Sequence, residues 1–134
     1  MTAESTETRT LYLDHAATSF PKPDGVAEAM AHAVVQASNA GRSGHQLALE
    51  GARILFRARR ALGSLMGVSD PRRVILTSGC TEALNTVIHG LDYPVGASIV
   101  TTDMEHNAVA RPLRALERKL GVRIVRVSTE ADGR

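Results

Sequence analysis

Residues 72–85 read RRVILTSGCTEALN, and this stretch decides the fold class of the chain. A short apolar run ends in a small, polar, glycine-containing turn, and a helix-like segment follows from Cys80. In parallel α/β folds ligands bind at such strand-to-helix turns, because free backbone N–H groups and the positive end of the helix point outward there. We therefore expect the turn at residues 77–82 to bind an anion such as a phosphate, with Gly79 allowing a close approach and Ser78 and Thr81 offering hydroxyl donors.

A structural alternative explains the same turn equally well. Ser78 or Thr81 could cap the helix, and Glu82 would be stabilised near its positive end. The chain contains neither the G-x-G-x-x-G pattern nor the P-loop pattern, which argues against dinucleotides and nucleoside triphosphates as ligands.

Apolar periodicity on both sides of the turn predicts alternating helices and strands. Residues 10–19 are expected to be extended and residues 39–46 to form a loop. Helices are predicted over residues 21–38, 47–66, 80–91 and 107–121, and strands over residues 72–78, 97–102 and 122–128. The order from residue 72 onward is βαβαβ, which is typical of an α/β fold with a parallel sheet and helices on both faces.

A second candidate, His106, follows Glu105 just past the predicted strand 97–102. If strands 72–78 and 97–102 are parallel neighbours, His106 lies at the same sheet edge as the turn, where an imidazole could stack on an aromatic ring or move a proton. The alternative is an ordinary polar loop residue or a satisfied hydrogen-bond partner. A metal site would need further ligands, and the remaining histidines show no spacing that supplies them.

The composition argues against nucleic-acid-binding, disulfide-bonded and membrane-spanning proteins. The 134 residues carry a formal charge of +2 with two Tyr, two Phe and no Trp, so bases would find few aromatic side chains to stack on, and we expect no nucleic-acid partner. The basic run at residues 53–62 is typical of a solvated helix face. One cysteine forms no internal disulfide, and neither a signal core nor eighteen consecutive apolar residues occur. We expect a cytoplasmic protein that does not enter a membrane.

Four segments together resemble one enzyme family. They are LYLDHAATSFPKP (11–23), NAGRSGHQLALEG (39–51), VILTSGCTEALN (74–85) and TTDMEHNAVARPLRAL (101–116). Their order and spacing resemble the start of class V aminotransferase-like enzymes, most closely the cysteine desulfurase and selenocysteine lyase branch. The resemblance implies the N-terminal part of the large domain of the pyridoxal 5′-phosphate (PLP) transferase fold, fold type I. It covers residues 11–130, so we expect a partial PLP-binding domain over residues 11–134 after a disordered tail at residues 1–10.

The resemblance also implies site residues. Gly79, Cys80 and Thr81 match the turn that holds the PLP phosphate, and His106 matches the histidine that stacks on the pyridine ring and assists proton transfer. The residues that match segments near the substrate are Asp14, Ala16, Ala17, Arg42 and His45, the last two on a loop that can cross a dimer interface. For Asp14, a loop carboxylate that caps nearby N–H groups is an equal alternative.

Cys80 is the only cysteine and lies at the start of a predicted helix, so a sulfur-carrying role is one interpretation. The resemblance argues against this role, because the persulfide cysteine of the family lies far downstream on a mobile loop. It implies instead a small residue packed beneath the phosphate.

The sequence departs from the family in length. Among its 134 residues only Lys22 and Lys119 are lysines, and neither matches the cofactor-binding lysine; the matching aspartate, the substrate-carboxylate arginine and the small domain are also missing. The resemblance therefore implies part of a PLP enzyme that acts on L-cysteine or a related amino acid, inactive by itself, in a homodimer or with a complementing C-terminal chain. The alternative is a non-catalytic binding or assembly module derived from that fold.

Overall fold

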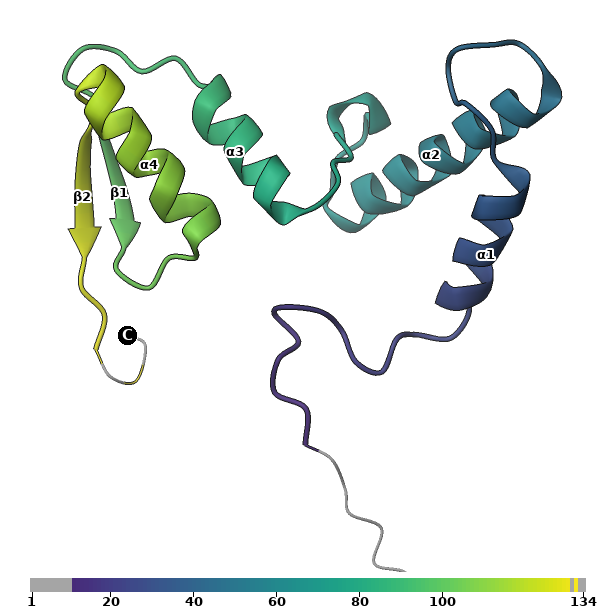
Figure 1. Ribbon diagram of the computed structural model, residues 1–134, viewed down its shortest axis with the longest axis horizontal. Coiled ribbons are helices and arrows are strands. Elements are labelled where there is room, and N and C mark those ends of the chain that lie inside the picture. Colours follow the sequence, from purple (N-terminus) through teal and green to yellow (C-terminus); the bar gives the residue numbers. More distant parts are fainter. Residues whose placement is uncertain (1–10, 131, 133–134) are drawn as a thin grey trace, which may run out of the picture. The chain divides into compact units, whose positions relative to one another are not determined.

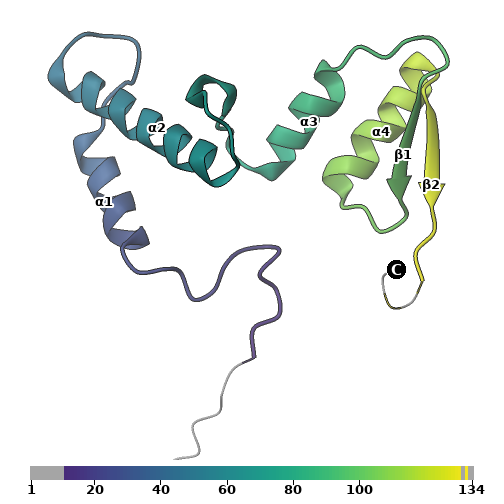
Figure 2. The same cartoon turned by 180° about the vertical axis from the view of Figure 1, so that it is seen from behind.

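The computed structural model describes residues 11–130 and 132 and falls into two compact units, one ending at Leu65 and the other beginning at Met66. Figure 1 and Figure 2 show the helices and strands of each unit from opposite sides. The tail predicted at residues 1–10 lies outside the described residues. Across the described part of the chain, helices are too short or too polar to cross a membrane.

The first unit contains two helices, α1 (Val26–Gln36) and α2 (Gln46–Leu65). The helix predicted at residues 47–66 is confirmed, whereas the helix predicted at residues 21–38 is shorter and begins only at Val26. The loop between them runs close to the second turn of α2. A Cβ placed on Gly51 would lie 2.7 Å from the carbonyl oxygen of Ser38, which is closer than real Cβ atoms come to an oxygen. Glycine at position 51 therefore allows the loop to pack against α2.

The extended segment expected at residues 10–19 needs correction. Residues 15–17 form a turn and not an extended segment, because the carbonyl oxygen of Asp14 accepts the N–H of Ala17 at 3.2 Å and the hydroxyl of Tyr12 donates to the same oxygen at 3.0 Å. Among the described residues, the apolar side chains of α1 include strongly exposed ones, with Met30 66% and Val34 82% exposed.

The second unit contains a short 3-10 turn followed by helices and strands in alternation. Its elements are η1 (Pro71–Arg73), α3 (Cys80–Gly90), β1 (Ser98–Thr102), α4 (Asn107–Leu120) and β2 (Arg123–Val127). The two strands pair in parallel, with Ser98 opposite Arg123 and Thr102 opposite Val127. The α/β class and the parallel βαβ arrangement are confirmed for residues 98–127.

The strand predicted at residues 72–78 is not formed. Its first residues belong to η1, and Val74 has an extended backbone, but no described residue pairs with the segment, and Ile75 is 72% exposed. A strand is stable only when a neighbouring strand takes up its N–H and C=O groups. The apolar residues at 74–76 favour an extended backbone, but no neighbouring strand among the described residues pairs with them.

The core of the second unit lies between α4 and the two strands. Strands β1 and β2 run side by side in both figures (Figure 1, Figure 2). The buried side chains of the core are Leu113, Leu116, Val122 and Ile124, and Ile88 of α3 packs at its margin. Burying an aliphatic side chain of this size stabilises a fold by about 1.5–3 kcal/mol. This packing fixes α4, and with it the residues that connect β1 to α4.

Candidate functional site

The turn before α3 leaves backbone donors free. Gly79 is the N-cap residue and supplies no side chain to cap the helix. Within the described residues, the N–H groups of Cys80, Thr81 and Glu82 have no acceptor, as expected for the first turn of a helix. The predicted caps by Ser78 or Thr81 are therefore wrong, and the positive end of α3 remains open to an anion.

Ser78 is occupied by another residue of the same turn. Its N–H and its hydroxyl both donate to Oε2 of Glu82, at 2.8 Å and 2.6 Å. These hydrogen bonds hold the pKa of the Glu82 carboxyl below its ordinary value of 4.5, so the side chain stays charged. Glu82 thus supports the turn as the sequence predicted, but Ser78 offers no free donor to a ligand, and Thr81 carries the free hydroxyl.

His106 occupies the N-cap position of α4. Its Nδ1 accepts the N–H of Ala108 at 3.1 Å, which requires Nδ1 to be unprotonated and places the proton of a neutral ring on Nε2. The ring is therefore oriented by the helix start and has one nitrogen left for other contacts. His106 is therefore a satisfied hydrogen-bond partner at the start of α4, as the non-catalytic alternative expected, and only its second nitrogen is available for a chemical role.

The loop that carries His106 is tied to both strands. The N–H of Asp103 donates to the carbonyl oxygen of Val127 at 3.1 Å, and the hydroxyl of Thr129 donates to the Asp103 carboxylate at 2.8 Å. The hydroxyl of Thr102 donates to Glu105 at 3.0 Å. These bonds fix His106 at the carboxyl edge of the parallel strands, where the sequence predicted it.

A pocket of about 330 Å³ brings the two candidates together. It is lined by Thr81, Asn85, His106, Asn107, Ala108, Arg111 and Pro112. Thr81 and His106 thus line the same pocket, and packing of α3 against α4, rather than a pair of neighbouring strands, brings them together. The pocket has an aliphatic wall, a threonine hydroxyl, a histidine and a guanidinium group.

The sequence predicted only Thr81 and His106 of the seven lining residues, and of the five others Asn85 and Arg111 bear most on the chemistry of the pocket. The side-chain amide of Asn85 donates to the carbonyl oxygen of Thr81 at 2.8 Å and to that of Ala108 at 3.3 Å. Arg111 lies on the wall with His106, and no ion pair holds it among the described residues. The position of Asn85 four residues after Thr81 on a helix was the available signal, since residues at that spacing lie on the same face.

Several predicted site residues do not line this pocket. Gly79 and Cys80 precede Thr81 on the turn; the Cys80 thiol is free and exposed, so the packed position expected for it is not observed. The substrate-proximal candidates all belong to the first unit, namely Asp14, Ala16, Ala17, Arg42 and His45. Within the described residues the Asp14 carboxylate accepts no hydrogen bond, because the N–H groups nearby are bound by its backbone carbonyl.

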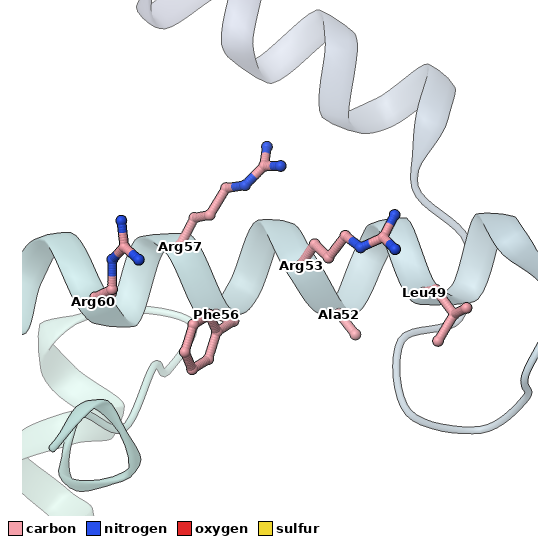
Figure 3. A pocket seen from close by; sticks show the side chains of 6 residues that line it. All are labelled: Leu49, Ala52, Arg53, Phe56, Arg57 and Arg60. Atoms are coloured by element: carbon pink, nitrogen blue, oxygen red, sulfur yellow. The ribbon is translucent and has the colours of Figure 1, made fainter.

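A larger hollow of about 480 Å³ lies along α2 in the first unit. Figure 3 shows arginine side chains on one side of the helix and Leu49 and Phe56 on the other. The remaining lining residues are Ala52, Arg53, Arg57 and Arg60, all from this one helix. The exposed arginines match the solvated helix face predicted for residues 53–62, and the hollow contains none of the candidate site residues.

The pocket between α3 and α4 fits an anionic ligand better than a metal ion. Thr81, with its free N–H and its hydroxyl, and the Arg111 guanidinium are donors on the wall of this pocket, as a phosphate requires. The free N–H of Cys80 lies next to Thr81 at the same helix start. A Cβ added to Gly79 would meet nothing within 4 Å, so a ligand has open space above the turn. The part of the chain that the structure describes contains no group of three His, Cys, Asp or Glu able to hold a metal.

Comparison with known proteins gives consistent matches. The family Aminotransferase class-V matches residues 11–134. The chain is 34% identical over 129 residues to cysteine desulfurase IscS of Stutzerimonas stutzeri (strain A1501), covering 92% of this chain and 31% of that protein. It is 35% identical over 126 residues to a cysteine desulfurase of Cereibacter sphaeroides, with 92% of this chain and 32% of that protein covered. The chain thus spans about a third of the length of the curated relatives it matches.

Proposed function

This chain belongs to the class V aminotransferase family, and we propose that it supplies the N-terminal part of a PLP-dependent cysteine desulfurase. The observation that carries the proposal is the shared pocket of Thr81 and His106, which places an anion-binding turn next to an oriented imidazole. Residues 11–134 would form the first part of the PLP-binding large domain. Selenocysteine lyase is the related activity that the same residues would serve.

The turn before α3 would bind the phosphate of PLP. The N–H groups of Cys80 and Thr81 and the Thr81 hydroxyl are the donors available to it, while Gly79 leaves the space through which the phosphate approaches. A charge-assisted hydrogen bond contributes about 1.5–3 kcal/mol before the losses of association. Arg111, on the wall of the same pocket, would add a positive charge.

His106 would stack on the pyridine ring and move a proton during the reaction. Because Nδ1 is bound to the Ala108 N–H, Nε2 is the nitrogen that would hold or release that proton. The chemistry that PLP would supply, when bound, is an electron sink for the α-carbon of L-cysteine, so that a cysteine thiolate outside these 134 residues could take the substrate sulfur as a persulfide and leave alanine. Asp14, Ala16, Ala17, Arg42 and His45 are proposed to approach the substrate.

These 134 residues by themselves would not complete the reaction. PLP enzymes of this fold bind the cofactor covalently through a lysine, and neither Lys22 nor Lys119 matches it. The missing groups would come from a complementing C-terminal chain or segment, or from the second subunit of a homodimer. The outer edges of β1 and β2, the two strands of the described sheet, have no strand partner among the described residues, which supports such an association. We place the protein in the cytoplasm.

Reconstitution tests the proposed function. The chain would be incubated with PLP and L-cysteine, alone and with a candidate C-terminal partner; alanine and sulfide would be measured, and borohydride reduction followed by peptide mass analysis would locate labelled lysines. We expect turnover only in the mixture, with the label on the partner. Turnover by the chain alone with stoichiometric label at one of its lysines would contradict the inactive-part proposal. PLP binding without turnover in every mixture would favour the non-catalytic module.

A further inference from the structure

Pro112 lies inside α4 and changes the hydrogen bonding of that helix. In an α-helix the N–H of residue 112 would donate to the carbonyl oxygen of residue 108, but proline has no N–H. The carbonyl of Ala108 therefore lacks its partner within the helix. Ala108 is only 6% exposed, so water is a poor substitute, and an unpaired buried carbonyl is unfavourable.

Asn85 of α3 supplies the missing donor. Its Nδ2 lies 3.3 Å from the carbonyl oxygen of Ala108 and 2.8 Å from that of Thr81. A carboxamide nitrogen carries two hydrogens, so each carbonyl can receive one. Of the side-chain hydrogen bonds among the described residues, the bond from Asn85 to Ala108 alone joins α3 to α4.

The peptide groups of Ala108 connect Asn85 to His106. The N–H of Ala108 donates to Nδ1 of His106 at 3.1 Å, while its C=O accepts from Asn85. A continuous series of hydrogen bonds thus runs from Thr81 through Asn85 and Ala108 to His106. Both ends of the series line the pocket between α3 and α4.

We propose that Asn85 is a positioning residue that sets the Thr81 turn relative to His106 by bonding the carbonyl that Pro112 leaves free. The expected effect of Asn85 on PLP binding rests on the proposed function. Its effect on the position of Thr81 relative to His106 does not. Asparagine suits the role because leucine of similar size has no donor, and aspartate would place an acceptor against two carbonyl oxygens.

The relationship between Asn85 and Pro112 gives a sharp test. Asn85→Leu removes both donors, and Pro112→Ala returns an N–H that can satisfy Ala108 within α4. The four proteins are the parent chain, each single variant and the double variant. Thr86→Val is the matched control, because the Thr86 hydroxyl donates to the Glu82 carbonyl at 2.8 Å within α3 and does not reach α4.

The first measurement needs no ligand. NMR signals of the Thr81 amide and the His106 ring are recorded in all five proteins, with the Ile99 and Ile124 methyl signals reporting that the paired strands are intact. We expect Asn85→Leu to move both the Thr81 and His106 signals, and Pro112→Ala to reduce the His106 displacement that Asn85→Leu causes. Thr86→Val should leave the His106 signal in place. If Asn85→Leu moves the Thr81 signal but not that of His106, the positioning role is overturned.

The second measurement is the affinity for PLP by calorimetry. Loss of one or two hydrogen bonds predicts about tenfold weaker binding for Asn85→Leu, and a smaller factor in the Pro112→Ala background. If Asn85→Leu weakens PLP binding by the same factor in the parent chain and in the Pro112→Ala protein, the link to Pro112 is overturned. If the parent chain binds no PLP while the ligand-free signals respond as expected, the proposed function fails and the positioning role stands.

Discussion

The carboxylate of Glu82 accepts two hydrogen bonds from Ser78, one from the Ser78 N–H at 2.8 Å and one from the Ser78 hydroxyl at 2.6 Å. Both bonds favour the charged carboxylate and hold the pKa of Glu82 below its ordinary value of 4.5. A carboxylate near the N-terminus of α3 also interacts favourably with the helix dipole. The turn is therefore stabilised from within, which leaves the N–H groups of Cys80 and Thr81 free for a ligand.

The lowered pKa of Glu82 predicts a pH-dependent loss of stability in Glu82→Gln. Because the folded-state pKa lies below the unfolded value of 4.5, the stabilisation is complete above that pH and is lost as the pH falls through the folded pKa. Thermal unfolding by circular dichroism should show the variant less stable at pH 7 and the two proteins converging in acid. A constant difference across this range would contradict the assignment. Asp70→Asn is the comparison variant, since Arg72 likewise lowers the pKa of Asp70 but the hydrogen bonds of Asp70 do not involve the turn at residues 77–82.

Gly51→Ala should destabilise the first unit although alanine is the better helix former. The added Cβ would lie 2.7 Å from the Ser38 carbonyl oxygen, and such overpacking costs about 1–3 kcal/mol, against up to about 1 kcal/mol gained in helix propensity. Denaturant unfolding measures the difference. Gly90→Ala is the control, because a Cβ there meets nothing within 4 Å, and it should be neutral or stabilising. A stabilised Gly51→Ala protein would show that the loop does not pack as described.

Two substitutions of His106 separate its helix-capping role from its chemical role. Asparagine is a good N-cap residue, so His106→Asn should keep the stability of α4, while His106→Ala should lose about 1 kcal/mol. In the reconstituted enzyme both variants should lower turnover more than cofactor retention, because both lack the imidazole. Turnover close to that of the parent protein in His106→Asn would mean that capping is the whole contribution of His106.

Exposed apolar side chains on the parallel strands predict association. Val100 of β1 is 69% exposed and lines an open apolar groove with residues of α3 and α4. We expect light scattering to show self-association that grows with concentration, and Val100→Lys to weaken it. Val95→Lys serves as the control, because Val95 is fully exposed outside the strands. A compact monomer at high concentration would contradict this expectation.

Local sequence patterns predicted the helices well. The apolar spacing at residues 47–66 and 107–121 gave α2 (Gln46–Leu65) and α4 (Asn107–Leu120) to within about one residue. The strand at residues 72–78 was wrong because strand formation depends on a neighbour that apolar sequence cannot reveal. The parallel pair of β1 and β2 succeeded because a helix of ordinary length joins them and allows the crossover.

The sequence predicted that Thr81 and His106 lie close together, but it gave the wrong structural cause for their proximity. Thr81 and His106 were expected to meet at the edge of two neighbouring strands, whereas packing of α3 on α4 brings them into one pocket. Asn85 was missed because its second acceptor, the carbonyl of Ala108, is free only through the absence of an N–H on Pro112. Such a contact depends on how two helices pack, and the periodicity of either helix alone does not contain it.

Binding of PLP and of pyridoxal, which lacks the phosphate, tests most directly whether Thr81 and His106 form one cofactor site. Calorimetry would compare both ligands on the parent chain, Thr81→Val and His106→Asn. We predict weak, saturable binding of PLP, much weaker binding of pyridoxal, and loss of the preference for PLP mainly in Thr81→Val. His106→Asn should lower the affinity for both PLP and pyridoxal, because the imidazole that would contact the pyridine ring is lost. Equal binding of the two ligands to the parent chain, or a preference for PLP unchanged in Thr81→Val, would contradict the account.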